Sequence, residues 1–284
     1  MSTVSNVYKA ENAPIADLVT YRALPTKHVD YIDPFLFLNH HGYQVYPKHN
    51  HGLPFGPHPH RGMETVTFIL EGDIAHKDSH GHESVIDAGG VQWMTAGRGL
   101  IHAEVSSDKF MKEGGPLEIL QLWLNLPAKD KMTAPHYEGL QKDKIPSLTF
   151  DNGKITVILV SGDWYGHKAA FTSGIGVQLN TIYFKQEGKI SIPLPEDHNV
   201  FFYVIKGNLK VNGTHVAMRH IAIINNDGGP LEVSSDSDSI LLFGHAKPLN
   251  EPVVAQGPFV MNTQQEIEEA YRDYQRGEFG TWEH

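Results

Sequence analysis

Two short fragments each carry a pair of metal-binding side chains two residues apart. The first is His58-Pro59-His60 and the second is His102-Ala103-Glu104. Residues at i and i+2 of a β-strand share one face, because successive side chains point to opposite faces. If two such strands face each other across a barrel, three imidazoles and one carboxylate meet at one point. This set is typical of a mononuclear transition-metal site with positions open to other ligands, which favours an enzyme over a structural module.

The composition is that of an ordinary globular protein, with 40% hydrophobic and 20% charged residues in a chain of 284. The length predicts one large domain or two of about 140 residues. The formal net charge of −10 and the lack of a Lys/Arg cluster argue against direct binding of nucleic acid. The chain has no cysteine, which excludes disulfides, zinc–thiolate sites, iron–sulfur clusters and a cysteine nucleophile.

The sequence predicts neither secretion nor membrane insertion. Residues 1–24 lack the basic start and apolar core of a signal peptide, and no apolar stretch reaches the ~18 residues of a membrane span. The absence of cysteine fits a reducing compartment. We therefore predict a cytoplasmic protein, or a nuclear one in a eukaryote.

Short alternating runs of apolar and polar residues recur between Gly, Pro, Asn and Asp residues, which is typical of β-strands separated by turns. No long helical period appears before the C-terminus. We expect an all-β fold with strands over residues 65–70, 91–96, 119–126, 155–160, 178–184, 200–205, 221–224 and 240–244.

The two halves of the chain repeat one local pattern. Residues 68–74 read FILEGDI and residues 203–209 read YVIKGNL, each a strand, a charged residue, a glycine turn and a second strand. This similarity at a separation of about half the chain indicates duplication of one β-domain. We predict a first domain over residues 1–135 and a second over residues 136–284, with a polar linker at residues 135–153.

The C-terminal part of the chain predicts one amphipathic helix. Thr263 and Glu266 have the spacing of a capping box, and Gly277 suits the position just after a helix. Apolar residues follow the cap at helical spacing, namely Ile267, Ala270, Tyr271 and Tyr274. We expect this face to pack on the rest of the fold rather than to bind a partner.

The region around the two fragments resembles the cupin superfamily. Gly52, His58, His60 and Glu64 closely follow the first cupin motif, whereas the second motif is looser and ends in His102 and Glu104. Longer strings are similar to the pirin family, and they run nearly from end to end of the chain. These strings are DPFL at 33–36, PHPHRGMETVT at 57–67, VQWMTAGRGLIHAE at 91–104, QLWLNLPA at 121–128 and GPFVMNT at 257–263.

The resemblance implies a bicupin, with two tandem cupin β-barrels, a short C-terminal helix and a metal ion in the N-terminal barrel. It implies that His58, His60, His102 and Glu104 bind a mononuclear metal, usually iron. The residue types agree, because imidazole and carboxylate ligands suit Fe(II), Mn, Co, Ni, Cu or Zn better than Mg or Ca. We expect Fe(II).

Glu64 fills the glutamate position of the first cupin motif, while Glu104 takes the carboxylate coordination. We therefore expect Glu64 to lie behind the ligands and orient one of them, or to act as a base. Glu104 and Glu64 are the two candidate catalytic residues, since either carboxylate could take a proton from a bound hydroxyl group.

Other residues near the motifs have simpler interpretations. His76, His80 and His82 surround a predicted hairpin turn and are expected at the surface. Four further histidines are expected in a solvated loop, where one or more could line the mouth of the site: His40, His41, His49 and His51.

Arg61 and Arg98 flank the predicted ligands and are expected to pair with acidic groups such as Glu64 or Glu71. Their apolar neighbours are expected in the core or in a pocket wall, namely Trp93 and Met94.

The second half of the chain lacks the metal ligands. At the 135-residue offset, the first motif falls on Pro193, Pro195 and Asn199. His198 alone remains in this region, and one imidazole is not a metal site. We expect a metal-free second barrel that supports the first by packing.

The resemblance to pirins implies a metal-dependent dioxygenase that cleaves quercetin-like flavonols with O2, and this is the function that we predict. Its partners would be a small aromatic substrate and O2, without nucleic acid or membrane. The resemblance also implies an alternative, a non-enzymatic iron or redox sensor that binds a protein partner as a transcriptional coregulator, because a sensor needs the same ligands. A sugar-epimerase-like cupin needs no metal and leaves the ligand set unexplained. We expect a monomer, since a duplicated barrel often functions alone.

Overall fold

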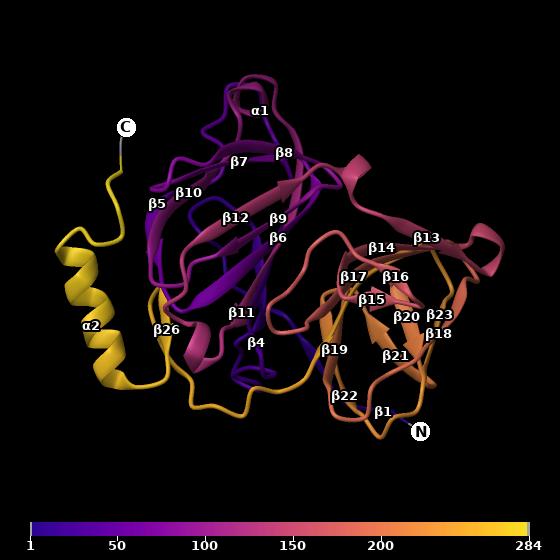
Figure 1. Cartoon of the computed structure of the whole chain (residues 1–284). Coiled ribbons are helices and arrows are strands. Elements are labelled where there is room, and N and C mark those ends of the chain that lie inside the picture. Colours follow the sequence, from indigo (N-terminus) through magenta and orange to yellow (C-terminus); the bar gives the residue numbers. More distant parts are fainter. Residues whose placement is uncertain (1, 283–284) are drawn as a thin grey trace. The chain divides into compact units, whose positions relative to one another are not determined.

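The structure is a computed structural model and describes residues 2–282. Most of the described chain is β-strand, arranged as two compact units, each built mainly on a larger sheet and a four-stranded sheet (Figure 1). The first barrel contains Ala13–Thr20, Phe35–Lys142 and the chain from Leu249, and the second barrel contains the chain up to Asn12, Tyr21–Pro34 and Asp143–Pro248. The prediction of an all-β chain with two barrels and a short C-terminal helix is confirmed.

The first barrel has one sheet in the order β5-β10-β7-β8 and a second sheet that contains the run β12-β9-β6-β11-β4. Neighbouring strands in these two runs pair antiparallel. The elements are β4 (Phe35–Tyr46), β5 (Phe55–His60), β6 (Met63–Glu71), β7 (Asp73–Asp78), β8 (Glu83–Asp87), β9 (Val91–Thr95), β10 (Leu100–Val105), α1 (Asp108–Glu113), β11 (Gly115–Asn125), η1 (Ala128–Asp130), β12 (His136–Leu140), β25 (Val254–Gln256), β26 (Phe259–Met261) and α2 (Gln264–Gln275).

The second barrel has a seven-stranded sheet in the order β1-β22-β19-β24-β17-β14-β13 and a four-stranded sheet in the order β18-β23-β20-β21. Its strands are β1 (Thr3–Lys9), β13 (Ser147–Phe150), β14 (Ile155–Ser161), β15 (Asp163–Trp164), β16 (His167–Lys168), β17 (Gln178–Phe184), β18 (Lys189–Ile192), β19 (Asn199–Lys206), β20 (Asn208–Val211), β21 (Thr214–Ala217), β22 (His220–Asn225), β23 (Leu231–Ser235) and β24 (Ser239–Ala246). The remaining short elements are β2 (Glu11–Asn12), β3 (Thr20–Leu24), η2 (Lys142–Lys144) and η3 (Asp151–Gly153).

The repeated sequence pattern occupies the same place in both barrels. Gly72 joins β6 to β7 and Gly207 joins β19 to β20. The φ angles of these glycines are +82° and +76°, in the left-handed region that glycine adopts without steric cost. Each turn connects the larger sheet of its barrel to the smaller one, as expected for a duplicated domain.

The ends of the chain differ from the predicted boundaries of 1–135 and 136–284. β1 pairs with β22 and so belongs to the second barrel, whereas the chain from Leu249 belongs to the first. Residues 135–153 are not a plain linker, because they supply β12 to the first barrel and β13 to the second. Local sequence patterns do not reveal these exchanges, since the pairing partners are distant in the chain.

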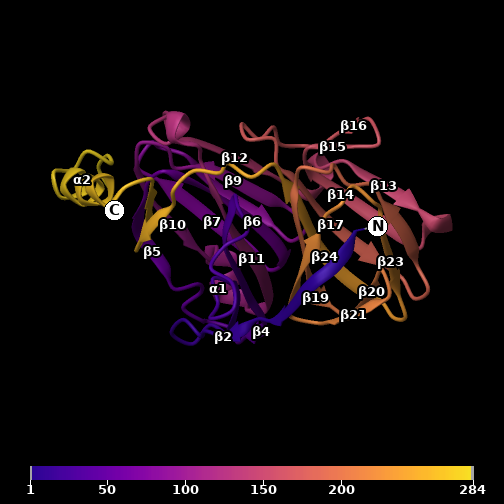
Figure 2. The same cartoon turned by 90° about the horizontal axis from the view of Figure 1, so that it is seen from below.

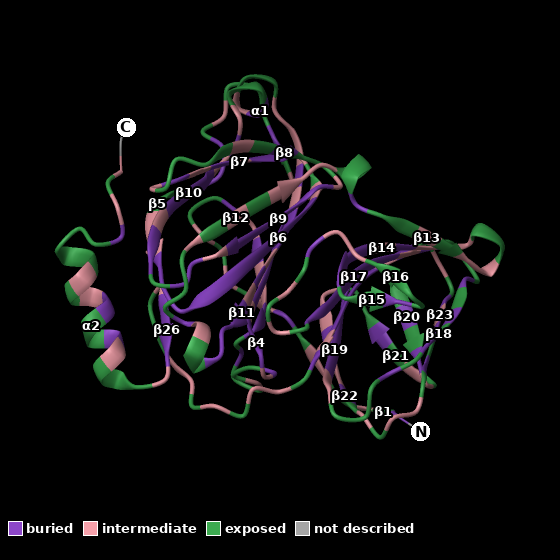
Figure 3. Ribbon diagram, in the orientation of Figure 1, coloured by how far each residue is buried: buried purple, intermediate pink, exposed green. Residues whose placement is uncertain are grey.

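The C-terminal helix forms as predicted. The Thr263 side chain accepts a hydrogen bond from the backbone N–H of Glu266, and the Glu266 carboxylate accepts one from the backbone N–H of Thr263. The buried face of α2 contains Ile267 and Ala270, with Tyr271 partly buried beside them, while much of the rest of the helix is exposed (Figure 3). This face packs in a cluster with Phe259, Met261 and Phe279. Tyr274, which was predicted on the packing face, is exposed. Among the described residues, no helix has the length and apolarity needed to cross a lipid bilayer.

Lys131 is a buried cation that ties the C-terminal segment to the first barrel. Its Nζ donates to the carbonyl oxygens of Gly62 and Val260, at 2.9 and 3.0 Å, and to Oδ1 of Asn125 at 2.7 Å. The Lys131→Met variant leaves these acceptors without a donor, so we expect the free energy of unfolding to fall by about 2–4 kcal/mol at pH 7. Urea unfolding measures this loss, and an unchanged free energy would contradict the assignment.

The same lysine predicts a pH dependence of stability. Burial lowers the pKa of Lys131 from 10.5 to about 8, against the opposing effect of Glu251 and Glu266. Between pH 8 and pH 10.5, Lys131 keeps its proton in the unfolded chain but loses it in the folded chain. The free energy of unfolding therefore rises with pH over this range. The stability advantage of the wild type over Lys131→Met should therefore grow from pH 8 to pH 10. An advantage that shrinks over this range would oppose the prediction.

Candidate metal centre

The two histidine-bearing strands are neighbours in one sheet, not strands that face each other across the barrel. β5 and β10 pair antiparallel, and His102 lies directly opposite His58. The predicted opposition of the strands is therefore wrong, although the predicted convergence of the histidines is correct. Directly opposite residues of an antiparallel pair share a face of the sheet, so β10 brings its histidine to the pair on β5.

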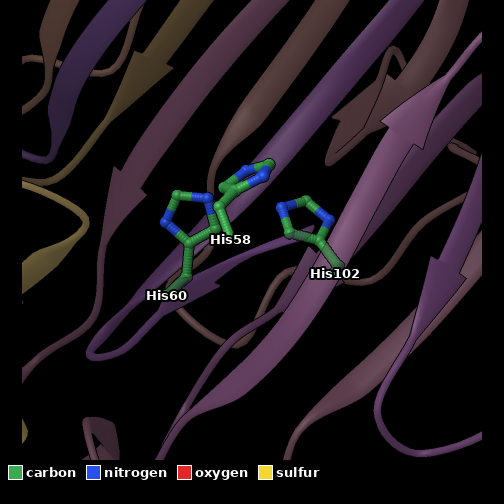
Figure 4. A group of neighbouring side chains, drawn as sticks. All are labelled: His58, His60 and His102. Atoms are coloured by element: carbon green, nitrogen blue, oxygen red, sulfur yellow. The ribbon is translucent and has the colours of Figure 1, made fainter. Parts of the chain in front are cut away.

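Three imidazoles converge on the inner face of this sheet. The ligand atoms of His58, His60 and His102 all lie within 4.8 Å of one another, and the three rings turn toward a common centre (Figure 4). The ring centroids are 4.4 Å apart for His58 and His102 and 5.0 Å apart for His60 and His102. His60 and His102 are buried, whereas His58 is partly exposed, so the group lies largely within the barrel.

Two backbone carbonyls fix the orientation of the β5 rings. Nδ1 of His58 lies 2.7 Å from the carbonyl oxygen of Gly56, and Nδ1 of His60 lies 3.2 Å from that of Pro258. A carbonyl oxygen only accepts hydrogen bonds, so each Nδ1 carries the proton. Each Nε2 therefore keeps its lone pair for a metal ion, the usual arrangement of metal-bound histidines.

The buried imidazoles are held in the form that binds metals. Burial lowers the pKa of His60 to about 3, and the neighbouring His58 adds to this effect. Burial also lowers the pKa of His102 well below its usual value, with a further contribution from His58, His60 and His76. Both rings are therefore neutral at physiological pH, and metal binding need not displace a proton from them.

A divalent cation fits this set of residues. Within residues 2–282, neither ring nitrogen of His102 has a hydrogen-bond partner, although both are buried. An unsatisfied buried polar atom costs about 1–3 kcal/mol. A transition-metal ion among the three rings would provide the missing partner for one of these nitrogens.

Glu104 lies on the same strand as His102, two residues further on, and is buried. Its Oε1 accepts from Oγ1 of Thr67 at 3.1 Å and from the amide of Gln92, and its Oε2 accepts from Nε2 of Gln121 at 3.2 Å. Thr67 and Gln121 belong to the opposite sheet, so Glu104 spans the barrel interior beside the histidines. Glu104 is not among the three residues whose ligand atoms all lie within 4.8 Å of one another.

Glu64 is separated from the centre by the alternation of its strand. Thr67 on β6 points into the barrel toward Glu104, and Glu64 is three residues away without an intervening bulge. Its side chain therefore points to the opposite face of the sheet. There Oε1 accepts from Oγ1 of Thr95 at 2.7 Å, and burial raises the pKa of the Glu64 carboxyl. We do not retain the prediction that Glu64 orients a ligand or acts as the base.

His76 is buried beside the three-histidine group, contrary to the surface position predicted for it. It is buried on β7, its ring lies 5.4 Å from that of His102, and it stacks on Tyr137 at 3.9 Å. Nε2 of His76 lies 3.3 Å from Oδ2 of Asp78, a buried carboxylate. Burial alone would raise the pKa of Asp78, but hydrogen bonds from His76 and from backbone N–H groups hold it well below the usual value. One sequence signal could have located His76: Ile74, His76 and Asp78 alternate as the residues on one face of a strand do.

The predictions for the remaining histidines are correct for those in turns and loops and wrong for those in β4. His80 and His82 are exposed in the turn between β7 and β8, as predicted. The exposed loop after β4 contains His49 and His51, also as predicted. The loop prediction is wrong for two buried residues of β4, namely His40 and His41, which bond to Oε1 of Glu118 at 2.9 Å and to Oγ1 of Thr20 at 2.9 Å.

The predicted partners of the two arginines differ from those observed. Arg61 pairs with Asp273 of α2, with 2.7 Å between Nη1 and Oδ2, rather than with Glu64 or Glu71. Arg98 is exposed, and its backbone oxygen accepts from Nε of Arg61 at 2.7 Å. The core positions predicted for the two apolar neighbours are confirmed, namely Trp93 and Met94.

The second barrel carries a pair of histidines, where the sequence indicated only His198. Nδ1 of His198 lies 2.8 Å from Nδ1 of His245, a residue of β24. Burial and the neighbouring His198 lower the pKa of His245 to about 3. The first-motif positions in this barrel are Pro193, Pro195 and Asn199, which supply no imidazole or carboxylate. That the second barrel binds no metal stays a prediction.

Comparison with known proteins identifies the family. The pirin family model matches residues 17–124, and the model of the pirin C-terminal cupin domain matches residues 180–280. The chain belongs to the pirin family. It is 37% identical over 261 residues to pirin of Mus musculus, covering 88% of this chain and 83% of that protein. It is also 37% identical over 263 residues to a pirin-like protein of Caulobacter vibrioides, covering 91% of each.

A solved structure shares the fold of this chain. The crystal structure described as quercetin 2,3-dioxygenase from Acinetobacter baumannii superposes with a TM-score of 0.94 at 33% sequence identity, and 99% of each chain is covered. The pirin resemblance stated from the sequence motifs and the bicupin fold that it implied are thus both confirmed. The first pirin model matches the half of the chain that carries the three histidines, and the second model matches the other half.

Proposed function

We propose that this pirin is a metal-dependent dioxygenase that cleaves quercetin-like flavonols with O2. The observation that carries the proposal is the group of His58, His60 and His102, whose ligand atoms lie within 4.8 Å of one another inside the first barrel. A relative with the same fold and 33% identity is described as a quercetin 2,3-dioxygenase, which supports this reaction class.

We propose the three histidines and Glu104 as ligands of one Fe(II) ion. Glu104 follows His102 at i+2, so the strand directs both side chains into the barrel. Neutral imidazoles with a carboxylate suit non-haem iron, although Mn, Co, Ni, Cu and Zn accept the same ligands. When bound, the cation would act as a Lewis acid toward the flavonol 3-hydroxyl and would hold the two reactants together.

An aromatic wall beside the histidines suits a planar aromatic substrate. Phe37 and Trp123 stack with their ring centroids 4.5 Å apart and their planes within 22°, and the Trp123 ring meets His60 edge-on at 5.2 Å. Both aromatic residues are only partly buried, so a ring of the substrate can pack on them. Stacking on such a wall would orient a flavonol relative to the histidines.

Glu104 is the proposed base. A carboxylate inside the barrel can accept the proton of the 3-hydroxyl group, and Gln92, Gln121 and Thr67 orient that carboxylate by hydrogen bonds. Loss of this proton makes the substrate ring electron-rich. Both atoms of O2 then enter the organic product, and the central ring opens with release of one carbon as carbon monoxide.

The test combines elemental analysis of the purified protein with quercetin turnover, first without and then with O2. We expect about one metal ion per chain, no reaction in the absence of O2, and equal consumption of quercetin and O2 when O2 is admitted. A metal-loaded protein that consumes no O2 with quercetin would refute the enzyme. The non-enzymatic redox-sensor alternative instead predicts partner binding that changes with the oxidation state of the metal.

A further inference from the structure

The C-terminal segment, residues 257–279, lies along the strands that carry the metal-binding histidines. Figures 1 and 2 both show α2, in yellow, on the side of the first barrel formed by β5 and β10. The backbone N–H of Val260 donates to the carbonyl oxygen of Arg61 at 3.0 Å, and Phe259 forms a parallel bridge with Arg61. The segment is therefore paired with the residue that directly follows His60.

One contact reaches a candidate ligand directly. The carbonyl oxygen of Pro258 accepts the hydrogen bond from Nδ1 of His60 at 3.2 Å. His60 is buried, so this carbonyl is what fixes the protonated nitrogen and the direction of Nε2. The position of the C-terminal segment thus determines the orientation of one imidazole of the centre.

Arg61, the residue after His60, makes a second set of contacts that hold the segment in place. The guanidinium of Arg61 pairs with Asp273 of α2 at 2.7 Å and lies 4.6 Å above the ring of Phe279. Arg61 is only 4% exposed and Asp273 13%, so this pair is shielded from solvent. Oγ of Ser79 donates to the carbonyl oxygen of Phe279 at 2.6 Å and accepts from the backbone N–H of Ile101, which precedes His102.

The backbone at Gly62 has no room for a larger residue beneath this segment. A Cβ at Gly62 would lie 2.0 Å from the carbonyl oxygen of Val260, and the φ angle is +78°. Even an alanine at Gly62 forces its own backbone and that of Val260 apart, and we expect this shift to disturb the contact between Pro258 and His60. Gly213 in the second barrel has a similar φ of +85°, and a Cβ there would meet nothing within 4 Å, so its substitution reproduces the backbone strain without the clash.

We infer that the C-terminal segment is part of the metal centre, because it positions His60 through the carbonyl of Pro258. The inference rests on the proposed metal site at His58, His60 and His102. Since the docked segment favours metal binding, the bound metal must favour docking of the segment to the same degree. Pro258, Arg61 and Asp273 are positioning residues, and none of them is proposed to touch the substrate.

The test measures the affinity for Ni2+ alone, by competition with a chelating dye, in two pairs of variants. Asp273→Asn removes the partner of Arg61, and its control Glu268→Gln changes an exposed carboxylate of the same helix. Gly62→Ala displaces β26, and its control is Gly213→Ala. We expect about tenfold weaker binding for Asp273→Asn and Gly62→Ala, the scale of contacts that orient a ligand, and no change for the controls.

Hydrogen exchange of the wild type gives a readout that needs no variant. Saturation with Ni2+ should slow the exchange of backbone amides at 259–262 and in α2, while β20 and β21 stay unchanged. Unchanged exchange in the segment, or unchanged Ni2+ affinity in both folded variants, would overturn the inference. If His58→Ala binds Ni2+ as tightly as the wild type, the metal centre itself fails. If His58→Ala loses Ni2+ while Asp273→Asn and Gly62→Ala retain it, only the role of the segment fails.

Discussion

The His58→Ala variant should lose metal and flavonol turnover together, with metal affinity reduced by at least about 100-fold. Removing one of the three converging imidazoles leaves only His60 and His102 in the group. Loss of a supporting residue typically lowers metal affinity 10- to 100-fold, and loss of a direct ligand should lower it more. His58 is partly exposed, so its truncation creates little buried cavity and the barrel should stay folded. Chelator competition and elemental analysis measure the loss.

His51→Ala is the matched control, because His51 is an exposed histidine of the same barrel in the loop before β5. It should keep the metal affinity and turnover of the wild type. A His58→Ala protein that retains full metal content and full turnover would show that the three-histidine group is not the site.

The Glu104→Gln variant should lower kcat for quercetin about 100- to 10,000-fold at saturating metal. An amide cannot take the proton of the flavonol, and the loss of a general base has an effect of this size. The variant should also be less stable by about 1–3 kcal/mol. The carboxylate accepts hydrogen bonds at both oxygens, whereas a glutamine amide offers one oxygen and turns its own donors toward Gln92 or Gln121.

Glu83→Gln serves as its control. Glu83 lies on β8 and pairs with Lys77 at 3.1 Å, and both side chains are exposed, so this pair contributes little to stability. It should leave kcat and the free energy of unfolding unchanged. If Glu104→Gln at saturating metal turns over quercetin at the wild-type rate, another group takes the proton.

The duplicated barrel and the histidine group could be predicted from the sequence because both depend on local patterns. The i, i+2 spacing fixes a shared face on any strand, and the glycine turn after β6 and after β19 marks equivalent positions in the two halves. The neighbouring arrangement of β5 and β10 could not be predicted in this way. Strand pairing depends on contacts between distant residues, which leave no periodic signal in either strand.

Glu64 and His76 show where motif-based reasoning fails. β6 is buried on both faces over most of its length, so no alternation of apolar and polar residues indicates which face lines the barrel. The place of Glu64 in the motif is therefore the only guide to it, and the register of β6 puts its side chain on the face away from the histidines. The turn after His76 suggests the surface, although His76 and Asp78 lie on β7 directly opposite Glu104 and His102 of β10.

The contribution of the C-terminal segment was also outside the reach of local patterns. The capping box predicted the helix correctly, since Thr263 and Glu266 are only three residues apart. Its ion pair joins Arg61 to Asp273, and its carbonyl contact joins His60 to Pro258, across about 200 residues of chain. The predicted boundaries grouped the helix with residues 136–284, whereas the chain from Leu249 packs with the first barrel.

The most direct test of the central claim is the anomalous scattering of crystals grown with a single divalent transition metal and measured at its absorption edge. The account predicts one strong peak in the first barrel, about 2 Å from nitrogen atoms of His58, His60 and His102. A fully loaded crystal without a peak at that position, or with its peak at another group of residues, would contradict it.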